Sequence, residues 1–182
     1  VAQLQHGGRK LAPGSQTKPW TPETVGQGFA AMRLPARIEV IQNAPLILLD
    51  GAHNQASAAA LGSVLDDWMG RQDARPRKQL LFGCSDDKDL DGMLGELLPR
   101  FDAVRFTQFE KNPRAAKLET LLAVARRLAP GVAASCHSTP EAALTEACRE
   151  LNEKDVLCIA GSLFLAAEVR PLLQPQSPLA NK

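Results

Sequence analysis

The 182-residue sequence has no tyrosine, and aromatic residues make up only 4% of it. Proteins that bind single-stranded nucleic acid stack bases on aromatic side chains, and many protein interfaces are anchored by them. Lys and Arg total 21 against 20 Asp and Glu, so the net charge is +1 and the chain lacks a broad basic field. The composition therefore argues against a nucleic-acid partner.

Long apolar runs are also missing from the sequence. No stretch reaches the roughly 18 apolar residues that a membrane-spanning helix requires. No basic segment followed by an apolar one marks a secretion signal near the N-terminus. We therefore expect a cytoplasmic protein without a membrane partner. Because the sequence begins with Val1 rather than methionine, we also expect it to be part of a longer protein.

The four cysteines lack the spacing of a zinc site. No C-x-x-C pair occurs, and the adjacent Cys136 and His137 have poor geometry for binding one metal ion. Cys158 lies in an apolar run over residues 155–160, where a thiol behaves as a small core side chain. We expect reduced thiols and no metal site formed by this chain.

The composition divides the chain into three parts. Residues 1–35 are rich in glycine, proline and glutamine without sustained periodicity, which predicts a linker or extended N-terminal arm. Over residues 36–173, short β-rich runs alternate with segments of helical period, which predicts one domain. Residues 174–182, with Pro175 and Pro178, are expected to form a flexible tail.

The alternation of strands and helices indicates the fold class. Two of the expected strands contain the runs 46–49 and 156–159, which are apolar without alternation, as in strands buried on both faces of a sheet. The pattern predicts an α/β fold: a Rossmann-like three-layer sandwich with a mostly parallel sheet of about six strands and helices on both faces. The strands are expected at residues 37–42, 45–50, 79–83, 103–109, 133–138 and 156–161, and the helices at residues 55–69, 90–99, 114–129, 141–152 and 162–173.

Candidate site residues follow the strands, because ligands of open α/β sheets bind at the carboxyl ends of the strands. Asp50 ends the second expected strand, and Gly51, His53 and Asn54 follow it. Gly51 permits a close backbone approach, Asp50 can accept hydrogen bonds from a ribose or hold a metal-bound water, and Asn54 is a candidate N-cap. The alternative is that Asp50 and Asn54 only tie the turn together and that His53 is structural.

Three further loops carry polar residues at the same edge. Lys88 can hold a carboxylate or phosphate as a point charge. The hydroxyl of Ser162 and the backbone N–H groups that follow it can bind an anion. Arg114 occupies another loop of this kind. Helix capping or a solvated surface is the alternative for each residue, but together they form the layout of a binding site whose ligand stays open.

Four segments of the sequence resemble one family in their order and spacing. They are residues 34–40, 48–54, 82–89 and 160–164, and the D-G-A-H-N sequence beginning at Asp50 is the most specific motif. The resemblance is to the C-terminal domain of folylpolyglutamate synthase/dihydrofolate synthase, a member of the Mur ligase superfamily, and it covers about residues 30–173.

The resemblance implies an ATP-dependent amide ligase that adds L-glutamate to dihydropteroate or folate. In such enzymes ATP phosphorylates the carboxylate to an acyl phosphate, and the glutamate amine then displaces phosphate. Mg²⁺ and positive groups stabilise the charge that develops. The cofactors implied are ATP and Mg²⁺, and the substrates are L-glutamate and a folate.

The resemblance also implies roles for individual residues. Arg37, Asp50 and His53 match ATP-binding positions, with Arg37 reaching the nucleotide phosphates. The candidate catalytic residues are His53, Ser162 and Lys88. The expected glutamate-binding residues are His53, Asn54, Lys88, Ser162 and Arg114.

The sequence departs from the family pattern in three places. The interdomain hinge of the family usually reads Pro-Gly-Arg, whereas Pro35, Ala36 and Arg37 stand here; if glycine supplies a positive φ there, either Ala36 is strained or the hinge has a different shape. Gln55 replaces a commoner proline. No Walker A sequence, G-x-x-x-x-G-K-[ST], occurs, so we expect the chain to be the C-terminal half of the enzyme. ATP and Mg²⁺ would then be held mainly by its own N-terminal ATPase domain, and the chain alone would be inactive.

Two alternatives remain open at this point. The chain could instead be the C-terminal domain of a muramyl-peptide ligase, although Asp50-Gly51 stands where those enzymes commonly carry Asp-Tyr. It could also be a non-catalytic α/β binding domain in which the ligase residues are relics. A dinucleotide-dependent oxidoreductase is disfavoured, because no G-x-G-x-x-G follows any expected strand.

Overall fold

The computed structural model describes residues 21–31, 34–69 and 76–173. The chain divides into two compact units, residues 1–33 and residues 34–182. Within the described residues, every helix is too short or too polar to cross a membrane. The residues of the expected C-terminal tail, 174–182, lie outside the described part of the chain.

The first unit contains helix α1, Pro22–Ala31. Its start is a reciprocal cap: Thr21 Oγ1 accepts a hydrogen bond from the Thr24 N–H at 3.2 Å, and Thr24 Oγ1 accepts one from the Thr21 N–H at 2.8 Å. Proline at the first helical position adds a preset φ. The prediction of a linker or extended arm over residues 1–35 missed this helix, because the glycines obscured the capping signal. Residues 1–20 and 32–33 lie outside the described residues.

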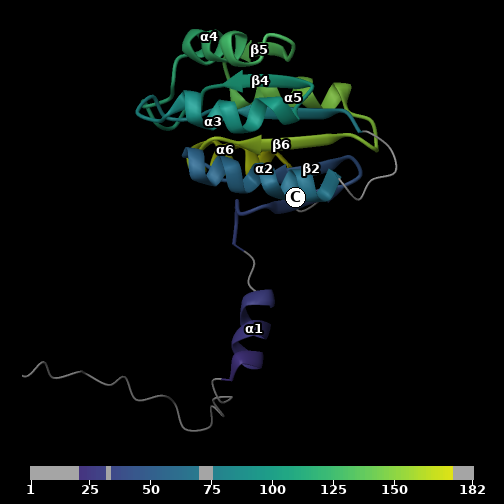
Figure 1. The fold of residues 1–182 in the computed structure, drawn as a ribbon. Helices are drawn as coiled ribbons and strands as arrows, with labels where there is room; N and C mark the ends of the chain where they lie inside the picture. The colour runs from purple at the N-terminus through teal and green to yellow at the C-terminus, as the bar shows by residue number, and fades with distance from the viewer. Residues whose placement is uncertain (1–20, 32–33, 70–75, 174–182) are drawn as a thin grey trace, which may run out of the picture. The chain divides into compact units, whose positions relative to one another are not determined.

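The second unit is built on a six-stranded sheet with the strand order β1-β2-β6-β3-β4-β5. Strand β1 runs antiparallel to β2, and all other neighbours are parallel. Figure 1 shows β5, β4, β6 and β2 stacked in this order. The predicted α/β fold with a mostly parallel sheet is therefore confirmed. The strands are β1 Glu39–Asn43, β2 Leu46–Leu49, β3 Lys78–Phe82, β4 Ala103–Thr107, β5 Ala133–His137 and β6 Val156–Ala160.

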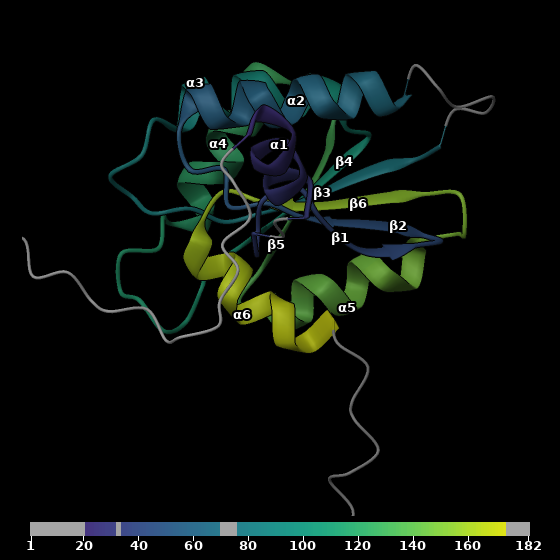
Figure 2. The same cartoon turned by 90° about the horizontal axis from the view of Figure 1, so that it is seen from below.

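Helices cover both faces of this sheet. Helices α2, α3 and α4 lie on one face and α5 and α6 on the other, as Figure 2 shows. Successive residues of the central strands alternate between the two cores: Leu80 and Phe82 pack toward α2, α3 and α4, whereas Leu81 packs toward α5 and α6. This explains the apolar runs without alternation. The helices are α2 Gln55–Met69, α3 Leu90–Leu97 with the 3-10 turn Leu98–Arg100, α4 Leu118–Leu128, α5 Pro140–Glu150 and α6 Leu163–Leu173.

One predicted helix starts later than expected. The sequence predicted a helix over residues 114–129, but α4 begins at Leu118. The preceding residues pair with the loop after β3: the Ala116 N–H donates to Cys84 O, and the Asp86 N–H donates to Arg114 O, both at 2.8 Å. These tertiary hydrogen bonds replace the first turn of the expected helix and hold Arg114 in a loop.

The four cysteines are free thiols. Cys84 and Cys158 are buried, as the apolar run predicted for Cys158, whereas Cys136 and Cys148 are exposed. Burial raises the pKa of the Cys84 thiol to about 12, so this side chain stays protonated and packs as a small apolar group.

Candidate functional site

A cavity of about 290 Å³ lies at the carboxyl ends of the strands. Four of the predicted site residues, carried by four different loops, line it: His53 follows β2, Lys88 follows β3, Arg114 follows β4 and Ser162 follows β6. The structure therefore brings together side chains that are up to 109 positions apart in the sequence, counting from His53 to Ser162. The rest of the lining comes from Ser85, Gly161, Leu163 and Phe164.

The turn between β2 and α2 is fixed by Asp50, whose side chain is buried. Its Oδ1 accepts a hydrogen bond from the Ala52 N–H and its Oδ2 accepts one from the Ile38 N–H, both at 2.7 Å. Asp50 thus ties this turn to the segment before β1. It does not line the cavity, and its predicted contact with ATP stays a prediction.

His53 has a defined ring orientation in this turn. Its Nδ1 lies 2.8 Å from the carbonyl oxygen of Gly51. Because a carbonyl can only accept, Nδ1 carries the proton and Nε2 is left as an acceptor in the neutral ring. Asn54 caps α2, since its Oδ1 accepts a hydrogen bond from the Ser57 N–H at 2.8 Å. The N-cap prediction for Asn54 is confirmed, and Asn54 does not line the cavity.

The segment before β1 forms a strained turn. The Arg37 N–H donates to Leu34 O at 3.2 Å, and Ala36 lies at the third position of this turn with a φ of 52°. A left-handed φ at this position favours glycine, so the expected strain at Ala36 is confirmed. Ala36 O accepts a hydrogen bond from the Gly51 N–H at 2.8 Å. Arg37 is exposed on this turn and does not line the cavity.

Glu39 connects this turn to helix α6. Its carboxylate accepts a hydrogen bond from the Ala36 N–H at 2.9 Å and pairs with the Arg170 guanidinium, with an Nη2–Oε1 distance of 3.0 Å. The hydrogen bond from Arg170, followed by that from Ala36, lowers the pKa of the Glu39 carboxyl. The turn therefore has supports from two directions, Asp50 and Glu39.

The Glu39 ion pair predicts a pH-dependent contribution to stability. A lowered pKa in the folded state means that the contribution is present above the ordinary glutamate pKa and is lost as the pH falls through the folded-state value. We expect Glu39→Gln to reduce the free energy of unfolding by about 1 kcal/mol near pH 7, and by less near pH 3. Urea unfolding at both pH values measures this difference. Glu153→Gln, an exposed change, is the control; an equal loss for Glu39→Gln at both pH values would contradict the prediction.

Lys88 and Arg114 are held by loops that are joined to each other. A β-bridge links Ser85 to Ala115, next to Arg114. Lys88 Nζ lies 3.1 Å from Asp87 Oδ2, and this hydrogen bond lowers the pKa of the Asp87 carboxyl. The Lys88 side chain is 33% exposed, so it can still be reached from the cavity. Lys88 and Arg114 therefore lie on two loops that the Ser85–Ala115 bridge holds together.

Glu168 of α6 supports the loop that carries Arg114. Its two carboxylate oxygens accept hydrogen bonds from the backbone N–H groups of Glu110 and Lys111, each at 2.8 Å. Glu168 is therefore a positioning residue for Arg114. The sequence analysis did not identify it, because a glutamate in the middle of a helix resembles any solvated side chain.

Replacing Glu168 by glutamine tests this support. Glutamine offers one acceptor oxygen, so one of the two backbone N–H groups loses its partner, and we expect a loss of about 1–2 kcal/mol in unfolding free energy. Hydrogen exchange should become faster at residues 108–116 and stay unchanged in β6. Glu141→Gln on the exposed side of α5 is the matched control. Unchanged exchange at residues 108–116 would show that Glu168 does not hold the loop.

Ser162 begins helix α6. Its side chain is buried and its Oγ accepts a hydrogen bond from the Phe164 N–H at 3.0 Å, so Ser162 does cap the helix, and its role toward a ligand stays a prediction. The hydroxyl proton remains available for a ligand. The preceding Gly161 has a φ of 114°. Ser162 thus combines capping with a position on the cavity wall.

The cavity also contains residues that the sequence analysis did not single out. Ser85 is buried and lines the cavity, and it lies in the same loop as Lys88. Phe164 is 42% exposed, and its ring contacts Phe109 with the centroids 5.4 Å apart. Within residues 21–31, 34–69 and 76–173, His, Cys, Asp and Glu side chains form no group of three that could hold a metal ion.

The sheet and the position of the cavity define the class of the second unit. A mostly parallel sheet, covered on both faces, with polar side chains converging at the carboxyl ends of its strands is a Rossmann-like domain with a candidate ligand site at that edge. Comparison with known families identifies it further. The family model of the dihydrofolate synthetase C-terminal domain matches residues 36–174, and the chain belongs to this family.

Similar proteins agree with this assignment. Over 109 residues, 59% of this chain, the sequence is 39% identical to a dihydrofolate synthase/folylpolyglutamate synthase of Mycobacterium tuberculosis, of which it covers 21%. It is also 29% identical to the folylpolyglutamate synthase of Lacticaseibacillus casei, and the matched region covers 85% of this chain and 33% of that protein. A crystal structure of a bifunctional folylpolyglutamate synthase/dihydrofolate synthase with Mn, AMPPNP and L-glutamate bound is 30% identical, with a TM-score of 0.71 over 86% of this chain and 36% of that one. The chain thus spans about a third or less of the proteins it matches.

Proposed function

We propose that the chain is the C-terminal, glutamate- and nucleotide-contacting part of an ATP-dependent ligase. This ligase would add L-glutamate to dihydropteroate or folate through an acyl-phosphate intermediate. The observation that carries the proposal is the convergence of His53, Lys88, Arg114 and Ser162 on one cavity. Family membership and the relative whose structure contains L-glutamate support it.

The chemistry of the cavity suits glutamate. Its volume of about 290 Å³ is close to the lower end of small-molecule pockets, roughly 300–1,000 Å³, and is appropriate for an amino acid. Lys88 and Arg114 supply two cations for the two carboxylates of glutamate, and the Ser162 hydroxyl supplies a further donor. With Nδ1 turned to the Gly51 carbonyl, His53 has Nε2 left to contact the amine that attacks the acyl phosphate. Asn54 would act through α2, which it caps.

The nucleotide would be contacted from the strained turn. Arg37 is exposed there and can reach phosphate groups, while Asp50 and Glu39 hold the backbone around it. ATP and Mg²⁺ would be bound mainly by an N-terminal ATPase domain, because the sequence contains no Walker A loop. When bound, the metal ion would stabilise the phosphate charge. We expect the isolated chain to be inactive, and the assembled enzyme to act in the cytoplasm.

A chimeric enzyme tests the proposed function. In it, this chain replaces the matching C-terminal part of the Mycobacterium tuberculosis relative, and ADP formation is measured with L-glutamate and dihydropteroate or folate. We expect folate-dependent ADP formation that the isolated chain lacks. A UDP-muramyl precursor is tested in parallel as substrate. Activity with that precursor alone, or a folded chimera without activity on any substrate, would overturn the proposal.

A further inference from the structure

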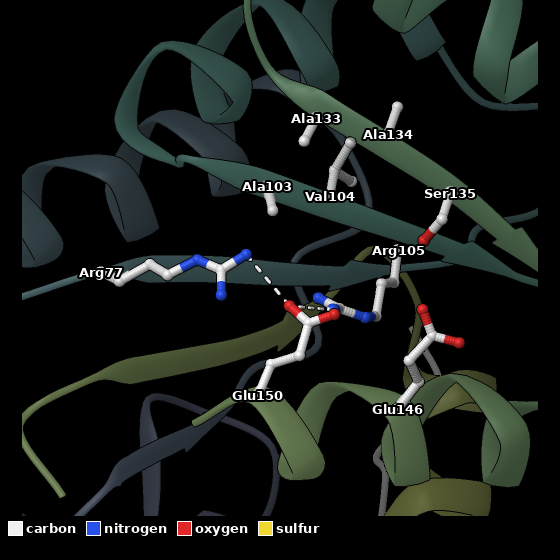
Figure 3. Close-up of a pocket in the computed structure, with 9 residues that line it drawn as sticks. All are labelled: Arg77, Ala103, Val104, Arg105, Ala133, Ala134, Ser135, Glu146 and Glu150. Atoms are coloured by element: carbon white, nitrogen blue, oxygen red, sulfur yellow. Dashed lines mark ion pairs between the residues drawn. The ribbon is translucent and has the colours of Figure 1, made fainter. Parts of the chain in front are cut away.

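A second, smaller cavity lies on the face of the sheet that α5 covers. It has a volume of about 160 Å³ and shares no residue with the candidate site. Figure 3 shows the Arg105 side chain extending from β4 toward Glu150 of α5; Ser135 of β5 and Glu146 of α5 also line the cavity. The register of β4 and β5 places Arg105 directly beside Ser135. Apart from Arg77, which directly precedes β3, the lining residues belong to β4, β5 and α5.

Two arginines of this cavity pair with the same glutamate. The Arg105 side chain is only 5% exposed, and its Nη2 lies 2.8 Å from Glu150 Oε2. Arg77 Nη2 lies 3.0 Å from the same oxygen. Glu146 is directed to His137, with an Oε2–Nδ1 distance of 3.7 Å. Two guanidinium groups thus share a single carboxylate oxygen, which leaves an excess of hydrogen-bond donors beside Glu150.

Two buried donors next to this pair have no acceptor among the described residues. Arg105 Nη1 donates to Gln79 Oε1, which leaves the Gln79 amide group, Nε2, without a partner, and Arg105 Nε is also unpartnered. A buried donor without an acceptor costs about 1–3 kcal/mol. Both orphaned groups are donors, so the missing partner is a group with acceptor oxygens. Buried cations with free donors are the usual environment of carboxylate and phosphate ligands.

We propose that this cavity is a second ligand site, specific for a small oxyanion, either a carboxylate or an inorganic phosphate. Arg77 and Arg105 bind the anion, and Glu150 is the internal competitor that it displaces. Gln79 contacts Arg105 from outside the cavity lining, and the Ser135 hydroxyl already pairs with His137 Nε2 at 3.0 Å. The volume lies below the roughly 300–1,000 Å³ of ordinary small-molecule pockets, which restricts the ligand to a few heavy atoms. The proposal does not depend on the ligase function of the other cavity.

NMR titration of the full 182-residue chain tests the site, with inorganic phosphate and succinate as separate ligands and sodium chloride at equal ionic strength as the reference. We expect one or both anions to move the Nε–H signal of Arg105 and the side-chain amide signals of Gln79. Tighter binding of phosphate or of succinate identifies the ligand class. Failure of both anions to move these signals at about 50 mM, well above a weak Kd of about 1 mM, would overturn the proposal.

Two variants separate this site from nonspecific attraction. Arg77→Met removes a half-exposed cation and should weaken binding about tenfold, whereas Glu150→Gln removes the competing carboxylate with little change of shape and should strengthen it about tenfold. Arg127→Met is the control, because Arg127 is an exposed arginine that pairs with Asp91. Equal weakening by Arg77→Met and Arg127→Met, or no gain for folded Glu150→Gln, would overturn the assignment.

Discussion

Replacing Gly161 by alanine is expected to lower the free energy of unfolding by about 3 kcal/mol. Gly161 has a φ of 114°, which side chains rarely permit. A Cβ atom added there would lie 2.7 Å from Gly83 O and 2.9 Å from the Phe82 ring. The backbone carbonyl cannot move without disturbing β3, so conformational strain and steric overlap add to each other. Urea unfolding of the full chain measures the loss.

Gly95→Ala provides a matched control for this change. Gly95 lies within α3, and a Cβ atom there would have no neighbour within 4 Å. Alanine in a helix interior is favoured over glycine by about 1 kcal/mol, so Gly95→Ala should stabilise the chain. The same chemical substitution is thus expected to have opposite signs at the two positions. A loss below about 1 kcal/mol at Gly161 would show that the end of β6 can relax.

Lys88→Met is expected to reduce kcat/KM for glutamate about a hundredfold in the chimeric ligase. Methionine keeps much of the apolar side chain and removes the charge that, in the proposed function, binds a glutamate carboxylate in the cavity. Most of the effect should be a higher KM for glutamate, because the contact is made in the ground state as well as in the transition state. Initial rates of ADP formation at varied glutamate concentrations measure it.

The KM for ATP distinguishes this role from general damage to the enzyme. We expect it to change by less than about twofold in Lys88→Met. Lys154→Met, which removes an exposed lysine from the turn before β6, should leave both KM values unchanged. An equal rise in the KM values for ATP and glutamate, or an unchanged KM for glutamate, would contradict the assignment of Lys88 to the amino acid.

The edge of the sheet that carries the candidate site could be predicted from the sequence. In a parallel sheet the carboxyl ends of all strands lie at the same edge, whatever the order of the strands. Polar residues after buried strands therefore had to gather at one edge. The N-cap role of Asn54 could also be predicted, because it depends only on residues next to it in the sequence. What the sequence could not show is that Asp50 and Asn54 stay outside the cavity wall while Ser85 joins it. That difference depends on side-chain directions set by tertiary hydrogen bonds.

The second cavity could not be predicted from the sequence, for a different reason. Arg105 lies in a strand that the sequence analysis predicted correctly, yet a single arginine in a short strand does not indicate which residue from another element will pair with it. Glu150 is 45 positions away, at the end of α5. Similarly, the strain at Ala36 could be anticipated from the hinge motif, but its two supports, Asp50 and Glu39, become visible only when the turn is packed.

The strand order has a consequence for how the domain folds. β6 is the last strand in the sequence, yet it lies between β2 and β3 and pairs with both. During synthesis, the β1–β2 hairpin and the β3–β4–β5 group therefore remain two separate pieces with open edges until residue 160 has left the ribosome. Such late, long-range parallel pairing makes folding slow. Nascent chains that stop before Val156 should accordingly be bound by chaperones or aggregate, even though they already contain five of the six strands.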